Sequence, residues 1–207
     1  RFVIRYKPSE EASLYASYTK GYKAAIIDVG GSCQNAPFIC NDIKPESINA
    51  FEVGGKYSAG GLNFELAGFY YDYKNLQVSL YKVGTAEVIN AAKSEIYGLD
   101  GQVRYEVTPA LQVNAGAAWT HARYKRFDNA PIYTPCPPAA QATCAASGVS
   151  FVIISQNLTN VPMQRTPAFT ANIGANYTAD LAGGELALSG NFYHSSKFHF
   201  GPSGTQF

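Results

Sequence analysis

Apolar and polar side chains alternate along most of the chain, which is the pattern of β-strands with one apolar face. The clearest example runs from Ile48 to Tyr81, where two alternating segments flank a Gly-rich turn at Ser58 to Gly61. In the second of these segments Leu62 and Phe64 share one face, whereas Asn63 lies on the other. The stretch therefore predicts a complete β-hairpin with one apolar and one polar face.

The same alternation recurs on both sides of this hairpin and predicts about eight strands. The connections between them run short, long, short, moderate, short, very long, short. Of the three longer connections, the first ends near Pro45, the second covers about Val83 to Ala92, and the third covers about Phe127 to Arg165. Transmembrane β-barrels combine short periplasmic turns with long outer loops, whereas a soluble sandwich has no reason to do so. We therefore expect an all-β fold, an antiparallel up-and-down transmembrane β-barrel.

The alternation also predicts which side chains face the bilayer. Positions on the opposite face are rich in Asn, Gln, Glu, Ser and Arg, which suits a wet or plug-filled lumen better than a dry core. Several strands are longer than the roughly 9–11 residues that cross a bilayer, so the sheet is expected to project beyond it. The side chains expected to face lipid are Leu62, Phe64, Leu66, Leu99, Val103, Leu111, Val113, Phe169, Ile173, Leu186 and Leu188.

Composition supports this interpretation and excludes others. Only 15% of the residues are charged, and 15 Tyr and 12 Phe give an aromatic-rich chain. The net charge of +1 provides no basic surface for nucleic acid, so no nucleic-acid partner is expected. No apolar run approaches 18 residues, which excludes a transmembrane helix. A soluble all-β domain and a complete eight-stranded barrel remain alternatives to a section of a larger barrel.

The four cysteines form two local pairs, Cys33 with Cys40 and Cys136 with Cys144, each in a Gly-, Pro-, Asn- or Ser-rich segment. This arrangement favours two disulfides in an oxidising compartment. A metal site is less favoured, because neither pair has the short spacing of a zinc knuckle and no His is close in sequence.

No constellation of residues indicates catalysis, a cofactor or a metal. The sequence Gly54-Gly55-Lys56 resembles part of a phosphate-binding loop, but Tyr57 follows it and a strand rather than a helix comes next. We therefore expect no enzyme activity. The only histidines lie near the outer ends of strands, where they are interpreted as solvated rim residues, and these are His121, His194 and His199.

Aromatic residues gather near the outer ends of the predicted strands, as in the interfacial girdle of a membrane barrel. Three of them, Tyr71, Tyr73 and Tyr193, fall on the lumen phase and are candidates for stacking on a bound ligand. The whole set is Tyr70, Tyr71, Tyr73, Trp119, Tyr124, Tyr193 and Phe198.

Several segments resemble strand motifs of the TonB-dependent outer-membrane receptors, in the right order along the chain. They are LYASYTKGYKA, IKPESINAFEVGGKY, LNFELAGFYYDYKNLQV, NAAKSEIYGLDGQV, LQVNAGAAWTHARY and TPAFTANIGANYTAD. The resemblance implies a 22-stranded barrel around an N-terminal plug, in the outer membrane of a Gram-negative bacterium. Residues 1–207 would form a middle-to-late section of barrel, without the plug, the TonB-contacting segment or the C-terminal strand.

The resemblance implies energised uptake of a scarce, bulky nutrient such as a siderophore-bound iron, a cobalamin or an oligosaccharide. The inner-membrane TonB complex would act on a plug outside this chain, so no nucleotide site is expected. We expect the loop from Phe127 to Arg165 to determine ligand selectivity, with a contribution from the segment Ala24 to Pro45. The competing hypotheses are a passive pore or structural surface barrel, and an extracellular carbohydrate-binding module.

Overall fold

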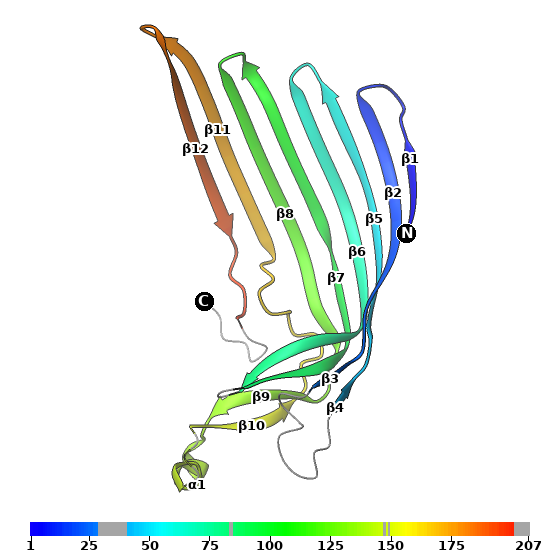
Figure 1. Ribbon diagram of the computed structural model, residues 1–207, viewed down its shortest axis with the longest axis vertical. Coiled ribbons are helices and arrows are strands. Elements are labelled where there is room, and N and C mark those ends of the chain that lie inside the picture. The colour runs from blue at the N-terminus through cyan, green and yellow to red at the C-terminus, as the bar shows by residue number, and fades with distance from the viewer. Residues whose placement is uncertain (29–40, 83–84, 147, 149, 201–207) are drawn as a thin grey trace.

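A computed structural model describes residues 1–28, 41–82, 85–146, 148 and 150–200 (Figure 1). The main sheet contains β1 (Phe2–Tyr6), β2 (Ala12–Lys23), β5 (Glu46–Ala59), β6 (Leu62–Lys82), β7 (Thr85–Thr108), β8 (Leu111–Arg126), β11 (Phe169–Leu181) and β12 (Gly184–Ser195). The outer connections contain β3 (Ile26–Asp28), β4 (Asn41–Ile43), β9 (Ala130–Pro135), η1 (Pro138–Ala140), α1 (Gln141–Ala146) and β10 (Phe151–Gln156).

The eight main strands form one antiparallel sheet whose spatial order is their order along the chain, β1-β2-β5-β6-β7-β8-β11-β12. This confirms the predicted up-and-down meander. In the described part of the chain β1 and β12 do not pair with each other, so the sheet is open at both edges. Among the same residues, no helix is both long enough and apolar enough to cross a membrane.

The turns that join β1 to β2, β5 to β6, β7 to β8 and β11 to β12 all lie at one end of the sheet, the upper end in Figure 1. Two of them are two-residue turns, Gly60–Gly61 and Ala182–Gly183, in which both residues have positive φ. That backbone geometry matches the right-handed twist of a hairpin, and glycine adopts it without steric cost. The predicted placement of these four short turns at one end of the sheet is therefore confirmed.

The expected moderate loop at Val83 to Ala92 is wrong over its described part. β6 extends to Lys82 and β7 begins at Thr85, so the two strands continue as one long hairpin past the other strands. Val78 pairs with Ile89 and is only 6% exposed, because it packs against the connection between β8 and β11. The local sequence of this segment predicts a loop, but the burial of Val78 and its pairing with Ile89 favour extended strands.

The eleven residues expected to face lipid all lie on one face of the sheet, called here the outer face. The register shows this directly, since Leu62 pairs with Tyr105 and Tyr105 pairs with Val113. Many of these side chains are open to solvent in the isolated sheet, with Ile173 59% and Leu188 56% exposed. The predicted phase of the strands is thus confirmed, while contact with lipid stays a prediction.

Two bands of aromatic residues cross the outer face. The band nearer the long loops, called here the aromatic row, joins neighbouring strands through ring contacts with centroids 5.0–6.5 Å apart. The second band, nearer the short turns, contains Tyr57, Tyr105 and Tyr177. Along β7 the aromatic row at Tyr97 is eight residues from Tyr105, which corresponds to about 26 Å of strand. Strand tilt reduces this to about 20 Å of height, close to the apolar band of outer-membrane barrels. The aromatic row is Tyr18, Phe51, Tyr70, Tyr97, Trp119 and Phe169.

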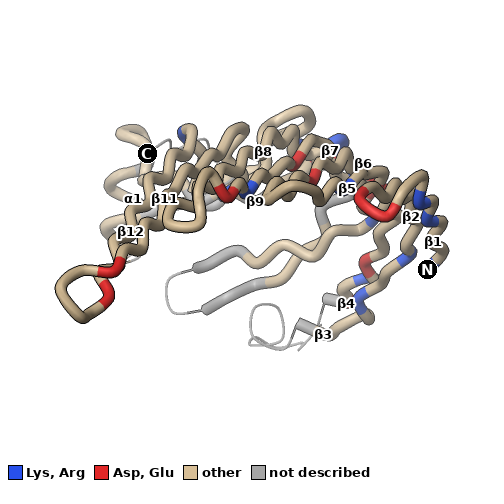
Figure 2. The backbone as a smooth tube through the Cα atoms, turned by 90° about the horizontal axis from the view of Figure 1, so that it is seen from above, with Lys and Arg blue, Asp and Glu red and all other residues tan. Residues whose placement is uncertain are grey.

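Seen along the strands, the backbone of the sheet forms an arc, with β3 and β4 on its concave side (Figure 2). The face opposite the outer face, called here the inner face, lies on this concave side. Its residues Ser94, Ala122 and Tyr124 are buried where the outer connections fold over the sheet. The expectation that Tyr124 belongs to the interfacial girdle is therefore wrong, because its side chain is only 1% exposed.

Candidate functional site

The inner face carries a concavity of about 420 Å³ in the middle of the sheet, called here the wall pocket. Its lining combines aromatic rings with carboxylates, hydroxyls and one Lys, and it includes one of the predicted ligand residues, Tyr71. Such a mixture suits binding by stacking and hydrogen bonding. The side chains that the following argument uses are Tyr15, Glu52, Phe69, Tyr71, Asp100 and Thr120.

Phe69 and Tyr71 on β6 form the aromatic part of the wall pocket. Their rings stack with centroids 5.1 Å apart and an interplanar angle of 27°. The Phe69 ring lies over Gly98 on β7, where a Cβ atom would come within 2.8 Å of it. Gly98 thus allows the ring to lie close to the sheet. Phe69 was missed as a candidate, although it shares the phase of Tyr71.

Tyr15 holds the carboxylate of the pocket in place. Its hydroxyl donates a hydrogen bond of 2.7 Å to Oε1 of Glu52 on the neighbouring strand. The Tyr15 ring crosses Gly54, where a Cβ atom would come within 2.6 Å of the ring. Because a larger residue at Gly54 would displace the ring, glycine here serves close side-chain packing rather than phosphate binding.

Nearer the short turns the inner face becomes strongly polar. Lys56 forms an ion pair of 2.9 Å with Glu65, and Nε2 of Gln102 donates a hydrogen bond of 3.1 Å to the same carboxylate. A groove of about 440 Å³ continues across β7, β8 and β11. In it Asn114 lies over Gly174, where a Cβ atom would come within 2.9 Å of Oδ1 of Asn114. This part of the wall offers amide donors and acceptors to whatever fills the lumen.

The three tyrosines proposed as ligand residues are only partly brought together. Tyr71 and Tyr73 are half-buried neighbours on the inner face of β6. Tyr193 lies opposite Asn172, on β12, and is 62% exposed. β7, β8 and β11 separate it from β6 within the open sheet. The ligand role of all three residues stays a prediction.

A packed structure, called here the cap, covers the inner face at the long-loop end. It consists of the outer half of the β6–β7 hairpin, the β9–β10 hairpin and the segment 157–163. Burial raises the pKa of Tyr124, so its hydroxyl remains protonated inside this core. Partly buried Leu76, Ile89, Val161 and Met163 surround the core, whose buried members are Val78, Tyr124, Phe127, Ala130, Ile132 and Leu158.

The other side of the β6–β7 hairpin is attached to the connection between β2 and β5. The amide of Gln77 donates to the carbonyl of Ala24 at 2.9 Å, and its backbone N–H donates to Glu46 at 2.8 Å. Lys44 and Asn90 exchange two hydrogen bonds of 2.8 and 3.1 Å. The hairpin therefore links the two loop regions that the sequence suggests as determinants of selectivity.

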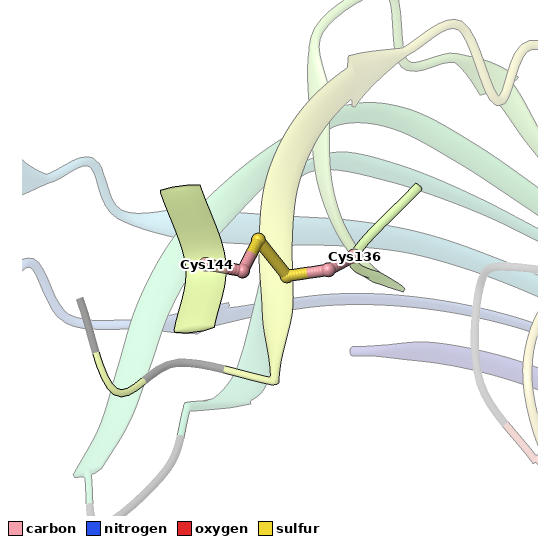
Figure 3. Close-up of a disulfide and its surroundings, with 2 residues drawn as sticks. All are labelled: Cys136 and Cys144. Carbon is pink, nitrogen blue, oxygen red and sulfur yellow. A yellow bond between two sulfur atoms is a disulfide. The ribbon is translucent and has the colours of Figure 1, made fainter. Parts of the chain in front are cut away.

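The predicted Cys136–Cys144 disulfide is confirmed, and it joins the end of β9 to α1 (Figure 3). The two Cα atoms are 6.5 Å apart and Cys144 is 5% exposed. The predicted apolar strand at Phe151 to Ile154 is also present, as β10, and it pairs with β9. Cys33 and Cys40 lie outside the described residues, so their pairing stays a prediction.

Replacing both Cys136 and Cys144 by Ser should loosen the tip of the cap without affecting the sheet. The disulfide lowers the conformational entropy of the unfolded loop, and for a ring this short that stabilises the folded loop by about 2–3 kcal/mol. We expect faster hydrogen exchange across α1, with unchanged heat-modifiable migration of the assembled protein. Free thiols at these positions in the wild-type protein, detected by mass spectrometry, would contradict the assignment.

The histidines and carboxylates do not gather into a metal site within the described ranges. No three His, Cys, Asp or Glu side chains of those residues come close enough together to hold an ion. His121 stacks on Tyr97 with centroids 4.6 Å apart, and the ring of His194 lies 6.3 Å from that of Phe169. Both imidazoles thus lie beside aromatic rings on the outer face.

Comparisons with known proteins agree with this geometry. The family model described as TonB dependent receptor-like, beta-barrel matches residues 1–206. Comparison with curated protein sequences gives no match.

Among solved structures, the chain is similar to the ferric yersiniabactin uptake receptor FyuA from Yersinia pestis, with a TM-score of 0.68 and 14% identity. It is also similar to BauA, the ferric preacinetobactin receptor from Acinetobacter baumannii, with a TM-score of 0.63 and 14% identity. A third similar structure is the siderophore receptor PiuA from Acinetobacter baumannii, with a TM-score of 0.62 and 19% identity. The alignments cover 97%, 97% and 95% of this chain but only 26%, 26% and 25% of the respective receptors.

Proposed function

The chain belongs to the family of TonB-dependent receptor β-barrels, and from this membership we propose that it forms a wall section and outer loops of a receptor for energised uptake. The receptor would lie in the outer membrane of a Gram-negative bacterium, where barrels of this family reside. Its ligand would be a scarce, bulky nutrient, with a siderophore-bound iron favoured over a cobalamin or an oligosaccharide. The family is one of receptors and transporters, and no catalytic step is proposed.

We propose that residues 1–207 supply only part of the barrel, with the plug and further strands outside them. Two observations support this. The chain spans about a quarter of the length of the receptors it matches. In addition, β1 and β12 are unpaired edges within the described residues, and an open edge inside lipid would leave backbone groups unsatisfied. The TonB complex would act through the plug.

The observation that carries the uptake proposal is the packed core of the cap at the long-loop end of the inner face. The cap core holds together β6, β8 and the segment 157–163 on the concave side of the sheet. A passive pore requires an open route along its wall, whereas a receptor requires outer loops ordered enough to bind with little entropy loss. The packed core therefore favours a receptor over a passive pore.

Uptake by the intact receptor tests this proposal. We expect one of three labelled probes, ⁵⁵Fe-yersiniabactin, cobalamin or maltohexaose, to accumulate in cells that contain TonB and not in cells that lack it. Accumulation independent of TonB, together with sugar-driven swelling of liposomes containing the receptor, would instead indicate a passive pore. Binding of the same probe to purified receptor separates recognition from transport.

Deleting Pro135 to Cys144 should remove ligand affinity but not the barrel. This segment contains η1, most of α1 and both disulfide cysteines, and it makes no contribution to the main sheet. We expect normal heat-modifiable migration and at least about a tenfold loss of affinity, which is about 1.4 kcal/mol. Full affinity in the deletion variant would show that this part of the cap only shields the barrel mouth.

A further inference from the structure

The polar side chains of the inner face are of two kinds. On β5, β6 and β7, from the wall pocket to the short turns, they include the charged residues Glu52, Lys56, Glu65, Asp100, Arg104 and Glu106. The corresponding parts of β8, β11 and β12 carry no charge on this face. Their amide and hydroxyl side chains are called here the amide track. They are Gln112, Asn114, Thr170, Asn172, Asn176, Thr178, Ser189, Asn191 and Ser195.

The amides of the track follow one another at intervals of two residues along the strands. Gln112 on β8 pairs with Asn176 on β11, and the next two rows each contain an amide opposite a glycine. Rows two residues apart are separated by about 7 Å. At Gly116 a Cβ atom would come within 2.7 Å of Oδ1 of Asn172, so the amide extends over the glycine. The track is therefore continuous across β8 and β11.

These amides are available to an occupant of the lumen. They line two grooves of about 440 and 330 Å³, and none of the residues lining the smaller one is charged. The larger groove borders Glu65 and Arg104 on its β6–β7 side. In the part of the chain that the structure describes, no side-chain hydrogen bond is formed by Gln112, Asn114, Asn172, Asn176 or Asn191.

The amides on the neighbouring strands are already engaged. Nε2 of Gln102 donates its hydrogen bond to Glu65, and Oδ1 of Asn63 accepts a hydrogen bond of 2.7 Å from the hydroxyl of Ser58. The contrast between engaged and available amides therefore coincides with the contrast between the charged and the uncharged part of the wall.

A row of similar, uncharged amides has the properties that a moving ligand requires. Its sites must be favourable enough for the ligand to enter and weak enough for it to leave. An amide both donates and accepts, and it exchanges hydrogen bonds with water at a small net free-energy change. A fixed charge would instead hold a group of opposite sign and repel one of the same sign.

On the basis of the uptake function proposed above, we propose that the amide track is the route along which the ligand passes from the middle of the lumen toward the short turns. A ligand that suits the track carries hydroxyl, carbonyl or amide groups over its surface. Thr170 and Thr178 are eight residues apart on β11, about 26 Å of strand, so the track offers several sites in succession. It is separate from the cap, to which recognition is assigned.

The test compares binding and transport by the intact receptor. It uses whichever of ⁵⁵Fe-yersiniabactin, cobalamin and maltohexaose accumulates in wild-type cells through TonB. We expect Asn114→Leu/Asn172→Leu to lower the maximal uptake rate at least about fivefold, because two hydrogen-bonding sites are lost. The affinity of the purified variant for the same probe should be unchanged. Asn114→Thr/Asn172→Thr, which keeps a hydroxyl at each position, should retain most of the uptake rate.

The matched control is Asn63→Leu/Gln102→Leu. These two amides lie in the same rows of the sheet as Asn114 and Asn172, and therefore at the same depth. They are outside the track and already form hydrogen bonds within the wall. The control variant should therefore take up the probe at the wild-type rate.

Several results would overturn the proposed route. They are wild-type uptake by the track variant, an equal fall in the control variant, or a loss of affinity that accounts for the fall. Vancomycin sensitivity of the track variant would show that the amides hold the plug in place instead. If that variant fails heat-modifiable migration, Asn176→Leu/Asn191→Leu must slow uptake for the proposal to stand. A wild-type receptor that accumulates none of the three probes through TonB would refute the uptake function itself.

Discussion

Ile173→Arg is expected to destabilise the assembled barrel by about 2–4 kcal/mol, the cost of a charge on the lipid face near the midplane. Ile173 is 59% exposed on the outer face, midway along β11 between Phe169 in the aromatic row and Tyr177 in the second band. In that position a guanidinium cannot reach either interface without distorting the strand or the bilayer. Equilibrium unfolding of the receptor in lipid vesicles measures the difference.

The control for this substitution is its neighbour on the same strand. Asn172→Arg places the same charge on the inner face, beside the polar groove, where we expect a far smaller effect. Leu188→Arg tests how the loss of stability depends on depth in the bilayer, because Leu188 pairs with Tyr177 at the level of the second band. Its cost should fall toward about 0–1 kcal/mol, the range expected near an interface. Equal costs at Ile173 and Asn172 would mean that both faces are packed, as in a soluble core.

Leu158→Ala is expected to destabilise the cap by about 2–5 kcal/mol while leaving the sheet intact. The Leu158 side chain is 1% exposed, and its backbone N–H donates a hydrogen bond of 2.8 Å to the carbonyl of Phe127. Removing three carbons there leaves a cavity between β6, β8 and β9. Hydrogen exchange of the β9 and β10 amides in the folded receptor measures the loss of protection.

The exposed apolar residue Ile154 provides the matched control. It lies on β10 and is 44% exposed, so Ile154→Ala should change cap exchange by much less than Leu158→Ala. Loss of heat-modifiable migration in Leu158→Ala would contradict the separation between cap and sheet. Unchanged exchange would contradict the existence of a cooperative cap core.

The sheet could be predicted from sequence because each strand carries its own period-2 pattern. Both faces of β7 follow from the alternation of Leu99, Gly101 and Val103 with their polar neighbours, and the structure keeps this phase. The local spacing of Cys136 and Cys144 likewise sufficed to predict their disulfide. In each case the information lies within a short stretch of chain.

The cap could not be predicted in the same way, because its contacts join distant segments. The local sequence around Val83 predicts a loop. Only the burial of Val78 against the β8–β11 connection explains why the chain forms strands there. Tyr124 has the sequence position of a girdle residue, and only its contacts with Phe127 and the other core residues show that it is buried. The separation of Tyr193 from Tyr71, by contrast, follows from the predicted meander, because β7, β8 and β11 lie between their strands.

The agreement between strand order and chain order bears on how the sheet can assemble. Five of the seven strand pairings join strands that only two to five residues separate along the chain, so they need little reduction in chain entropy. The pairing of β8 with β11 instead closes the longest connection in the chain, between Arg126 and Phe169. Internal structure in that connection shortens the effective loop, since β9 and β10 form their own local hairpin. The cap thus lowers the entropic barrier to adding the last two strands, a kinetic role separate from any contact with a ligand.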